Sequence, residues 1–125
     1  MKFLRTAIAA LFISGALVSC SKDKDLPSFT IEGSWTGKIG TGAASPNGQF
    51  ALNIKKDGDL ERIGATGNVT AAGSWNLQGN KFTGIYFYPS GTVVDITGTL
   101  DQLTNKITGT WSNNGNEEGS FFVTK

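Results

Sequence analysis

A short phrase, in which glycine is followed by serine or threonine and then by tryptophan, constrains this chain more than any other feature. It occurs at residues 33–35, 73–75 and 109–111, so each of the three tryptophans follows a glycine by two positions. Residues two apart in a β-strand lie on the same face of the sheet. A bulky ring beside a glycine on one face suits a strand that bends and packs tightly inside a closed sheet. The repeat therefore predicts an all-β domain.

The segment 29–39 has the alternation that this interpretation requires. Its odd positions are all apolar or glycine, and its even positions are all polar. A period of two predicts a strand with one buried face and one face in water. Comparable segments predict eight strands in all, at residues 29–39, 49–55, 59–66, 69–77, 81–88, 93–100, 107–111 and 119–125.

Turn signals separate these segments. Asp57-Gly58 predicts a hairpin turn whose two central residues both have positive φ. Residues 40–48 predict a longer loop, since a proline, an asparagine and small residues gather there. The segment 59–66 is the least regular, because Leu60 and Ile63 are out of step with a period of two. We therefore expect a bulge in that strand.

Eight short strands joined mostly by hairpin-length turns predict a meander. A meander with one apolar face removes its two free edges by closing on itself. With eight strands, the interior is just wide enough for side chains or for one small ligand. The alternative is a β-sandwich of two sheets, which the nearly uniform hairpins disfavour. We expect a single eight-stranded antiparallel up-and-down barrel over residues 29–125.

Residues 1–19 have the composition of an export signal. Lys2 and Arg5 precede an apolar run over residues 7–18 that one serine and one glycine interrupt. The run is too short for a comfortable membrane-spanning helix, so a retained anchor helix is the less favoured alternative. We expect residues 1–19 to be a signal peptide.

The signal ends in Leu17-Val18-Ser19-Cys20, which resembles the lipobox of bacterial lipoproteins. The resemblance implies cleavage after Ser19, attachment of diacylglycerol to the Cys20 thiol, and acylation of the new amino terminus, with palmitate as a typical chain. Each buried methylene contributes about 0.8 kcal/mol to membrane partitioning, so several acyl chains make a stable anchor. Cys20 is the only cysteine, which excludes a disulfide within one chain.

Residues 20–28 follow as a charged, proline-containing segment that can bury little, and they predict an acylated flexible tether. The position after Cys20 is not aspartate, which disfavours the inner-membrane retention familiar from enteric lipoproteins. The run 21–25 is similar to the charged surface-export tethers of some Gram-negative lipoproteins. We therefore expect an outer-membrane lipoprotein of the cell envelope, on either the periplasmic or the surface face.

The predicted barrel itself resembles the avidin and lipocalin families. Gly33-Ser34-Trp35 is similar to the Gly-x-Trp of the first lipocalin strand, and residues 109–113 look like an avidin strand. The segment 31–125 also resembles small Gram-negative envelope lipoproteins that end in the pattern found at 119–125. These resemblances imply a lipocalin-like fold, and they carry no ligand-binding residue over to this chain.

Composition leaves little chemistry for catalysis. The chain has no histidine, and the resemblance to lipoproteins assigns its single thiol to lipid. The usual general base, zinc ligand and triad are therefore missing. Acidic pairs at Asp57/Asp59 and Glu117/Glu118 flank turns, offer too few oxygens for a calcium loop, and are not placed in one cleft. We expect neither an enzyme, nor a cofactor, nor a metal site; an envelope hydrolase is a distant third hypothesis.

The charge balance also limits the partners. The formal net charge is +1, and removing Lys2 and Arg5 with the signal leaves acidic and basic side chains nearly equal. That balance provides no basic surface for nucleic acid. The membrane would be contacted through the acyl chains, because no polybasic segment is present.

Aromatic side chains supply the candidate binding residues. Aromatic rings at a barrel mouth suit a small apolar or glycan ligand, although core packing is the ordinary explanation for the tryptophans. The candidates for the interior or a ligand cavity are Trp35, Trp75, Trp111, Tyr86 and Tyr88.

The strand at 81–88 is apolar on both faces, whereas the outer face of a soluble barrel is normally polar. This predicts an outer docking patch, unless loop 40–48 or the tether covers it. The candidate residues for this patch are Ile85, Phe87, Val93 and Phe122.

Together these patterns predict a lipid-anchored, non-enzymatic binding or interaction module of the envelope. The alternative is a structural accessory subunit of an envelope complex that docks through its outer face. An unfilled cavity beside the tryptophans would favour ligand binding, whereas a solid core with a flat apolar exterior would favour docking.

Overall fold

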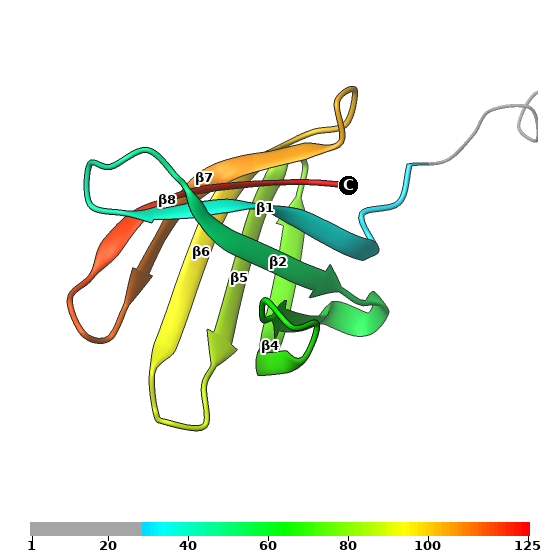
Figure 1. Ribbon diagram of the computed structural model, residues 1–125. Helices are drawn as coiled ribbons and strands as arrows, with labels where there is room; N and C mark the ends of the chain where they lie inside the picture. The colour runs from blue at the N-terminus through cyan, green and yellow to red at the C-terminus, as the bar shows by residue number, and fades with distance from the viewer. Residues whose placement is uncertain (1–28) are drawn as a thin grey trace, which may run out of the picture. The chain divides into compact units, whose positions relative to one another are not determined.

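The computed structural model describes residues 29–125, which contain a closed antiparallel barrel of eight strands (Figure 1). The strands are β1 (Gly33–Thr41), β2 (Gly48–Ile54), β3 (Asp59–Ile63), β4 (Val69–Gln78), β5 (Lys81–Phe87), β6 (Val93–Asp101), β7 (Lys106–Asn113) and β8 (Glu118–Thr124). Each strand pairs with the next along the chain, and β8 pairs with β1. The predicted up-and-down barrel is confirmed, and the sandwich alternative is wrong.

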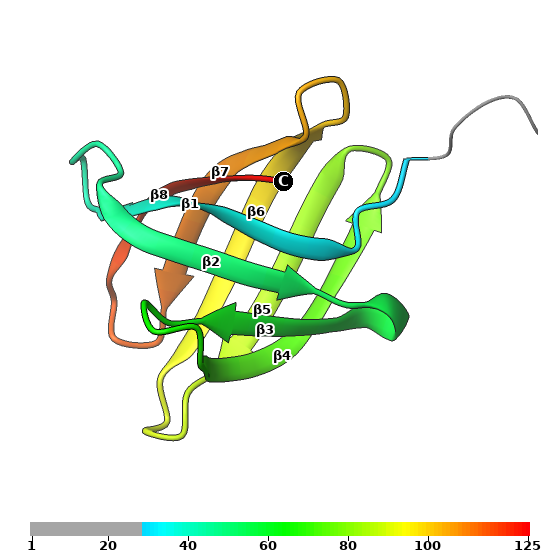
Figure 2. The same cartoon turned by 45° about the vertical axis from the view of Figure 1, so that its right-hand side comes forward.

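The first three strands run across the next three, so the sheet is strongly coiled. Figure 2 shows β1, β2 and β3 running across β4, β5 and β6, with β8 beside β1. Such strong coiling is how a short eight-stranded sheet closes. The predicted signal peptide, Cys20 and the tether at 20–28 lie outside the described residues. Within residues 29–125, no helix is long and apolar enough to cross a bilayer.

The first strand begins later than the alternation predicts. Residues 29–32 are not paired as a strand, and Gly33 has a φ of 136°, in the region that favours glycine. Ile31 is nevertheless buried in the core, and its carbonyl accepts a hydrogen bond from the indole Nε1 of Trp35 at 2.7 Å. Burial therefore continues beyond the point where the ladder ends, and the predicted start at residue 29 is wrong.

The other strand limits differ by a few residues. The first loop covers 42–47 instead of 40–48, since β1 and β2 pair as far as Ile39 and Gly48. The third strand ends at Ile63, three residues before the predicted end at 66. Its register against β4 shifts between Arg62 and Ile63, which confirms the expected bulge.

The predicted hairpin turn at Asp57-Gly58 is confirmed. The two residues have φ values of 65° and 82° and lie in a short 3-10 turn, η1 (Lys56–Gly58). Two successive positive φ values are the requirement of a type I′ turn, whose twist matches that of the flanking strands.

Large rings and glycines are paired across the inner face of the barrel. A glycine lies directly opposite six of the inner aromatic residues. A Cβ built on four of these glycines would lie 1.9 Å from a carbonyl oxygen of the neighbouring strand. The backbones therefore approach too closely there for any other residue, and each ring covers its glycine. The pairs are Phe50 and Gly37, Tyr86 and Gly73, Trp75 and Gly84, Phe82 and Gly98, Phe121 and Gly109, and Trp111 and Gly119.

The middle of the barrel is filled by side chains. Trp35, Phe50 and Phe82 are fully buried, together with aliphatic residues from β2, β3, β6, β7 and β8. The rings of Phe50 and Phe121 meet edge to face at 5.4 Å between centroids. Among the described residues, no polar or charged side chain is fully buried. The interior is thus a packed apolar core, as expected for a barrel of this size.

Candidate functional site

The three tryptophans serve the core in the same way. Trp35 is fully buried, whereas Trp75 and Trp111 are partly buried and pack against the core. Every indole N–H donates to a backbone carbonyl: that of Ile31 at 2.7 Å, of Lys55 at 2.7 Å and of Gly40 at 2.8 Å, respectively. The polar atom of each ring is therefore committed within the protein, as buried indoles usually are.

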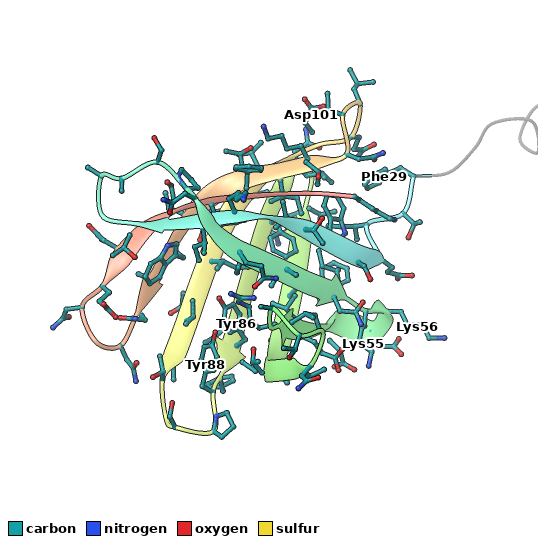
Figure 3. The ribbon with its side chains drawn as sticks, viewed as in Figure 1. Phe29, Lys55, Lys56, Tyr86, Tyr88 and Asp101 are labelled. Carbon is teal, nitrogen blue, oxygen red and sulfur yellow. The ribbon has the colours of Figure 1, made fainter. Side chains whose placement is uncertain are left out.

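The two candidate tyrosines lie together near the end of β5. Tyr86 is buried and Tyr88 is half-buried, with their ring centroids 5.8 Å apart in an edge-to-face contact. Figure 3 shows both side chains near the end of β5, well away from Asp101, which ends β6. The backbone around Tyr88 is fixed by its N–H bond to the Thr92 carbonyl at 2.9 Å.

Arg62 also points into the barrel at this end, and the sequence analysis did not identify it. Its register partners are Leu52 on β2 and Ala71 on β4, both of which are buried. The guanidinium carbon lies 4.7 Å from the centroid of the Phe50 ring. We call the set Phe50, Arg62, Tyr86 and Tyr88 the tyrosine end of the barrel.

Strand β3 sends alternate charges to opposite faces. Leu60 and Arg62 share the inner face, whereas Glu61 lies on the outer face. There the Glu61 carboxylate lies 3.6 Å from the Lys55 ammonium and accepts a hydrogen bond from Asn53 Nδ2 at 3.1 Å. The acidic neighbour of Arg62 in sequence is therefore engaged on the other side of the sheet.

Two backbone carbonyls hold the guanidinium in place. Nη1 donates to the carbonyl of Ile63, at the bulge, and Nη2 donates to that of Gln49 at 3.1 Å. The bulge interrupts the regular pairing between Arg62 and Ile63. The Ile63 carbonyl accepts its hydrogen bond from the arginine at this point. Within residues 29–125, no carboxylate lies within ion-pair distance of Arg62.

The residues of β4 beside Arg62 and Tyr86 are small, and the two side chains interact directly. Ala71 is the register partner of Arg62, and Gly73 is that of Tyr86. Burial raises the pKa of the Tyr86 phenol well above its usual range, and Tyr88 adds to the increase, while the nearby Arg62 acts in the opposite direction. The phenol is therefore protonated at neutral pH and can donate a hydrogen bond.

The outer-face candidates fall into two places. Phe87 is 51% exposed and lies opposite Val93, and both are near the half-buried Ile85. Phe122 is on β8, in a row that meets β6 at Thr99, six residues along the strand from Val93. The Lys106 ammonium covers the Phe122 ring at 4.9 Å. The structure thus brings three of the four residues together and leaves Phe122 apart.

Two hollows open on the outer surface of the sheet, and both are lined by a mixture of polar and apolar groups. The larger, of about 450 Å³, is formed mainly by outward side chains of β6, β7 and β8, and the smaller, of about 250 Å³, by those of β4, β5 and β6. Asp95 contributes to both hollows, and neither includes a lysine or arginine. Trp111 and Trp75 reach one hollow each, but the tyrosines reach neither.

The acidic pairs flank turns, since Asp59 begins β3 and Glu118 begins β8. Asn113 Oδ1 accepts from the N–H groups of Gly115 and Glu117, and Asn113 Nδ2 donates to the Glu117 carboxylate at 2.9 Å. Asp57 supplies the first positive φ of its hairpin. Over residues 29–125, no three histidine, cysteine or acidic side chains gather as a metal site would require. These carboxylates are accounted for by turn geometry.

In comparisons with known proteins, no family model, no curated protein and no solved structure matches this chain. Its class therefore rests on its own geometry. The described part is a small eight-stranded antiparallel up-and-down barrel with a packed core, and an arginine points inward at one end.

Proposed function

We propose that this protein is a lipid-anchored, non-enzymatic binding module of the outer membrane, and that it holds a small ligand at the tyrosine end of its barrel. The observation that carries the proposal is the inward-pointing Arg62, which has no carboxylate partner among the described residues. Arg62 is partly buried at the end of the barrel, and a ligand with a negative charge there would form a charge-assisted pair with its guanidinium.

The packed core favours a ligand at the end of the barrel over one enclosed in its middle. Trp35, Phe50 and Phe82 are fully buried in the middle of the barrel, whereas Tyr88 and Arg62 are only partly buried. A ligand that contacts these two residues would complete the contacts of Arg62 without displacing the core. The same tyrosines are among the cavity candidates predicted from the sequence.

Binding can be tested by titrating the purified protein with envelope glycans, fatty acids and small organic acids while following intrinsic fluorescence and melting temperature. We expect one of these classes to raise the melting temperature, because a ligand that binds only the folded state stabilises it. The effect should disappear in Tyr88→Ala and persist in Thr110→Ala, a change on the outer face. If no compound changes either signal, ligand binding at this end is wrong.

The anchor is supported by the lipobox resemblance at 17–20. We expect cells expressing the protein to incorporate a palmitate analogue into it, and a Cys20→Ala variant to incorporate none. Persistent labelling of that variant would overturn the assignment of Cys20 as the lipid attachment site.

A second function, docking as an accessory subunit, is favoured by the patch formed by Ile85, Phe87 and Val93. An aromatic residue with half its surface in water beside two aliphatic neighbours is a candidate partner surface. Crosslinking in intact cells should yield a protein adduct that Phe87→Ser abolishes and Phe122→Ser retains. An adduct pattern unaffected by Phe87→Ser would exclude docking through this patch.

A further inference from the structure

We infer that the ligand of the tyrosine end is a small organic monocarboxylate with an apolar body, whose carboxylate binds the guanidinium of Arg62. The inference rests on the proposed function, because it names the chemical class that this same site would take. Its grounds are the charge at the site, the donors that the guanidinium has left, and the apolar side chains at this end.

The charge of Arg62 is not balanced on the inner face. Its neighbours there, Phe50, Leu52, Ala71 and Tyr86, are all neutral at pH 7. Glu61, the adjacent acid, is held on the outer face by Lys55 and Asn53. A ligand with a single negative charge would therefore neutralise the site, whereas a cation would be repelled.

The guanidinium has donors left over after its described contacts. The Phe50 ring lies against the guanidinium, the two carbonyl bonds occupy one N–H each of Nη1 and Nη2, and the Tyr86 phenol takes a further hydrogen bond. A guanidinium has five N–H donors, so others remain for a ligand. Edge-on approach is the geometry in which arginine binds a carboxylate through two parallel hydrogen bonds.

A carboxylate fits this site better than a phosphate group does. Arg62 is the one cation with a described contact to the inner rings, and one cation balances one negative charge. The Tyr86 hydroxyl, protonated at neutral pH, is a further donor beside it. A phosphate monoester carries up to two charges and usually recruits several basic groups.

The surroundings explain the apolar body of the ligand. Ile39 and Tyr88 are half-buried near this end of the strands and pack against the core. Covering partly exposed apolar side chains is favourable, because it removes apolar surface from water. A fully polar acid would leave this contribution unused.

The test compares 4-phenylbutyrate with its neutral isostere 4-phenylbutanamide, both titrated into the purified full-length protein at pH 7 and followed by calorimetry. We expect the acid to bind at least about tenfold more tightly than the amide, because only the acid forms a charge-assisted pair. Arg62→Gln should remove this preference. Lys106→Gln is the matched control, since Lys106 also covers an aromatic ring but does so on the outer face.

Arg62 also supports the bulge, so its replacement could affect folding. Arg62→Lys keeps the charge but lacks the planar fork. With an unchanged melting temperature, it should bind the acid several-fold less tightly than the wild type. Equal affinity of Arg62→Lys and wild type for the acid would contradict the two-bond contact.

The outcomes separate the two proposals. If acid and amide bind the wild-type protein equally well, and Tyr88→Ala weakens both, the carboxylate inference is wrong while the binding module stands. If neither compound binds but a neutral glycan does at the tyrosine end, the inference is likewise overturned alone. If no ligand of any class binds there, both proposals fail.

Discussion

Trp111 shows how much a single side chain contributes to this barrel. Its ring extends from β7 over Gly119 of β8, and its indole N–H reaches the Gly40 carbonyl of β1. A Cβ on Gly119 would lie 2.8 Å from that indole nitrogen. The absence of a side chain at Gly119 therefore leaves room for the hydrogen bond that Trp111 makes to Gly40. This relation gives a physical reason for one of the Gly-Thr-Trp phrases.

Tyr86 leads to a prediction about pH at the same scale. Its raised pKa means that the folded state holds the phenol proton more tightly than the unfolded chain, where tyrosine ionises near pH 10. Unfolding above about pH 10 then releases a proton, so stability is complete below that pH and falls as the pH rises. We expect chemical denaturation between pH 7 and 11 to show a steeper alkaline loss in wild type than in Tyr86→Phe.

Tyr88→Phe provides the control for that measurement, since it removes a neighbouring phenol while keeping Tyr86. Its profile should retain an alkaline decline attributable to Tyr86. If wild type and Tyr86→Phe lose stability in parallel above pH 10, burial of the Tyr86 phenol is not the cause of the decline.

Individual site residues were predictable only in part. The inward direction of Tyr86 follows from the alternation with Phe82 and Gly84, and the structure shows the buried side chain that this implies. Arg62 lies two residues after the buried Leu60 and so on the same face of β3. Because it is charged and the strand is irregular, the sequence offered no reason to assign Arg62 to the interior. Its position depends on the bulge that follows it and on the Phe50 ring beneath it, which only the folded chain brings together.

At the scale of the element, the inner glycines decide how closely two strands approach. Gly109 is the clearest case, since a Cβ there would lie 1.9 Å from the Thr97 carbonyl oxygen and 2.5 Å from the Gly98 Cα. We expect Gly109→Ala to force β6 and β7 apart and to destabilise the protein by about 2 kcal/mol or more, in the range of overpacked cores. Chemical denaturation of the variant measures this loss.

Gly115→Ala is the comparison for that variant. Gly115 lies in the β7–β8 turn, where a Cβ would come no closer than 3.4 Å to the Asn113 side chain, and it has no positive φ. Its replacement should change stability by no more than about 0.5 kcal/mol. Equal losses for the two variants would contradict close approach of the backbones as the role of Gly109.

Elements were more predictable than their limits. All eight strands appear in the expected order, because alternation and turn residues are local signals. The start of β1 was misplaced because Ile31 continues the apolar alternation and is buried, although it is not paired in a strand ladder. The third strand stopped early because its bulge ends the regular pairing.

At the scale of the whole molecule, closure leaves no strand at an edge. β1 is hydrogen-bonded to β2 on one side and to β8 on the other, over six register pairs with β8. We therefore expect amide protons of β1 and β8 to exchange as slowly as those of β5 and β6, through global unfolding only. Native-state hydrogen exchange measured by NMR checks this. Exchange of β1 and β8 through local opening, at a distinctly lower free energy, would contradict a closed barrel in solution.

The pairing of β1 with β8 also has a consequence for how the chain acquires its structure. Register partners such as Thr36 and Thr124 are separated by almost the entire folded segment, and contacts of such long separation slow folding. In a nascent chain, β1 cannot pair with β8 until the residues of β8 have been synthesised. The barrel therefore closes only after the whole domain has been made, however early its other hairpins form.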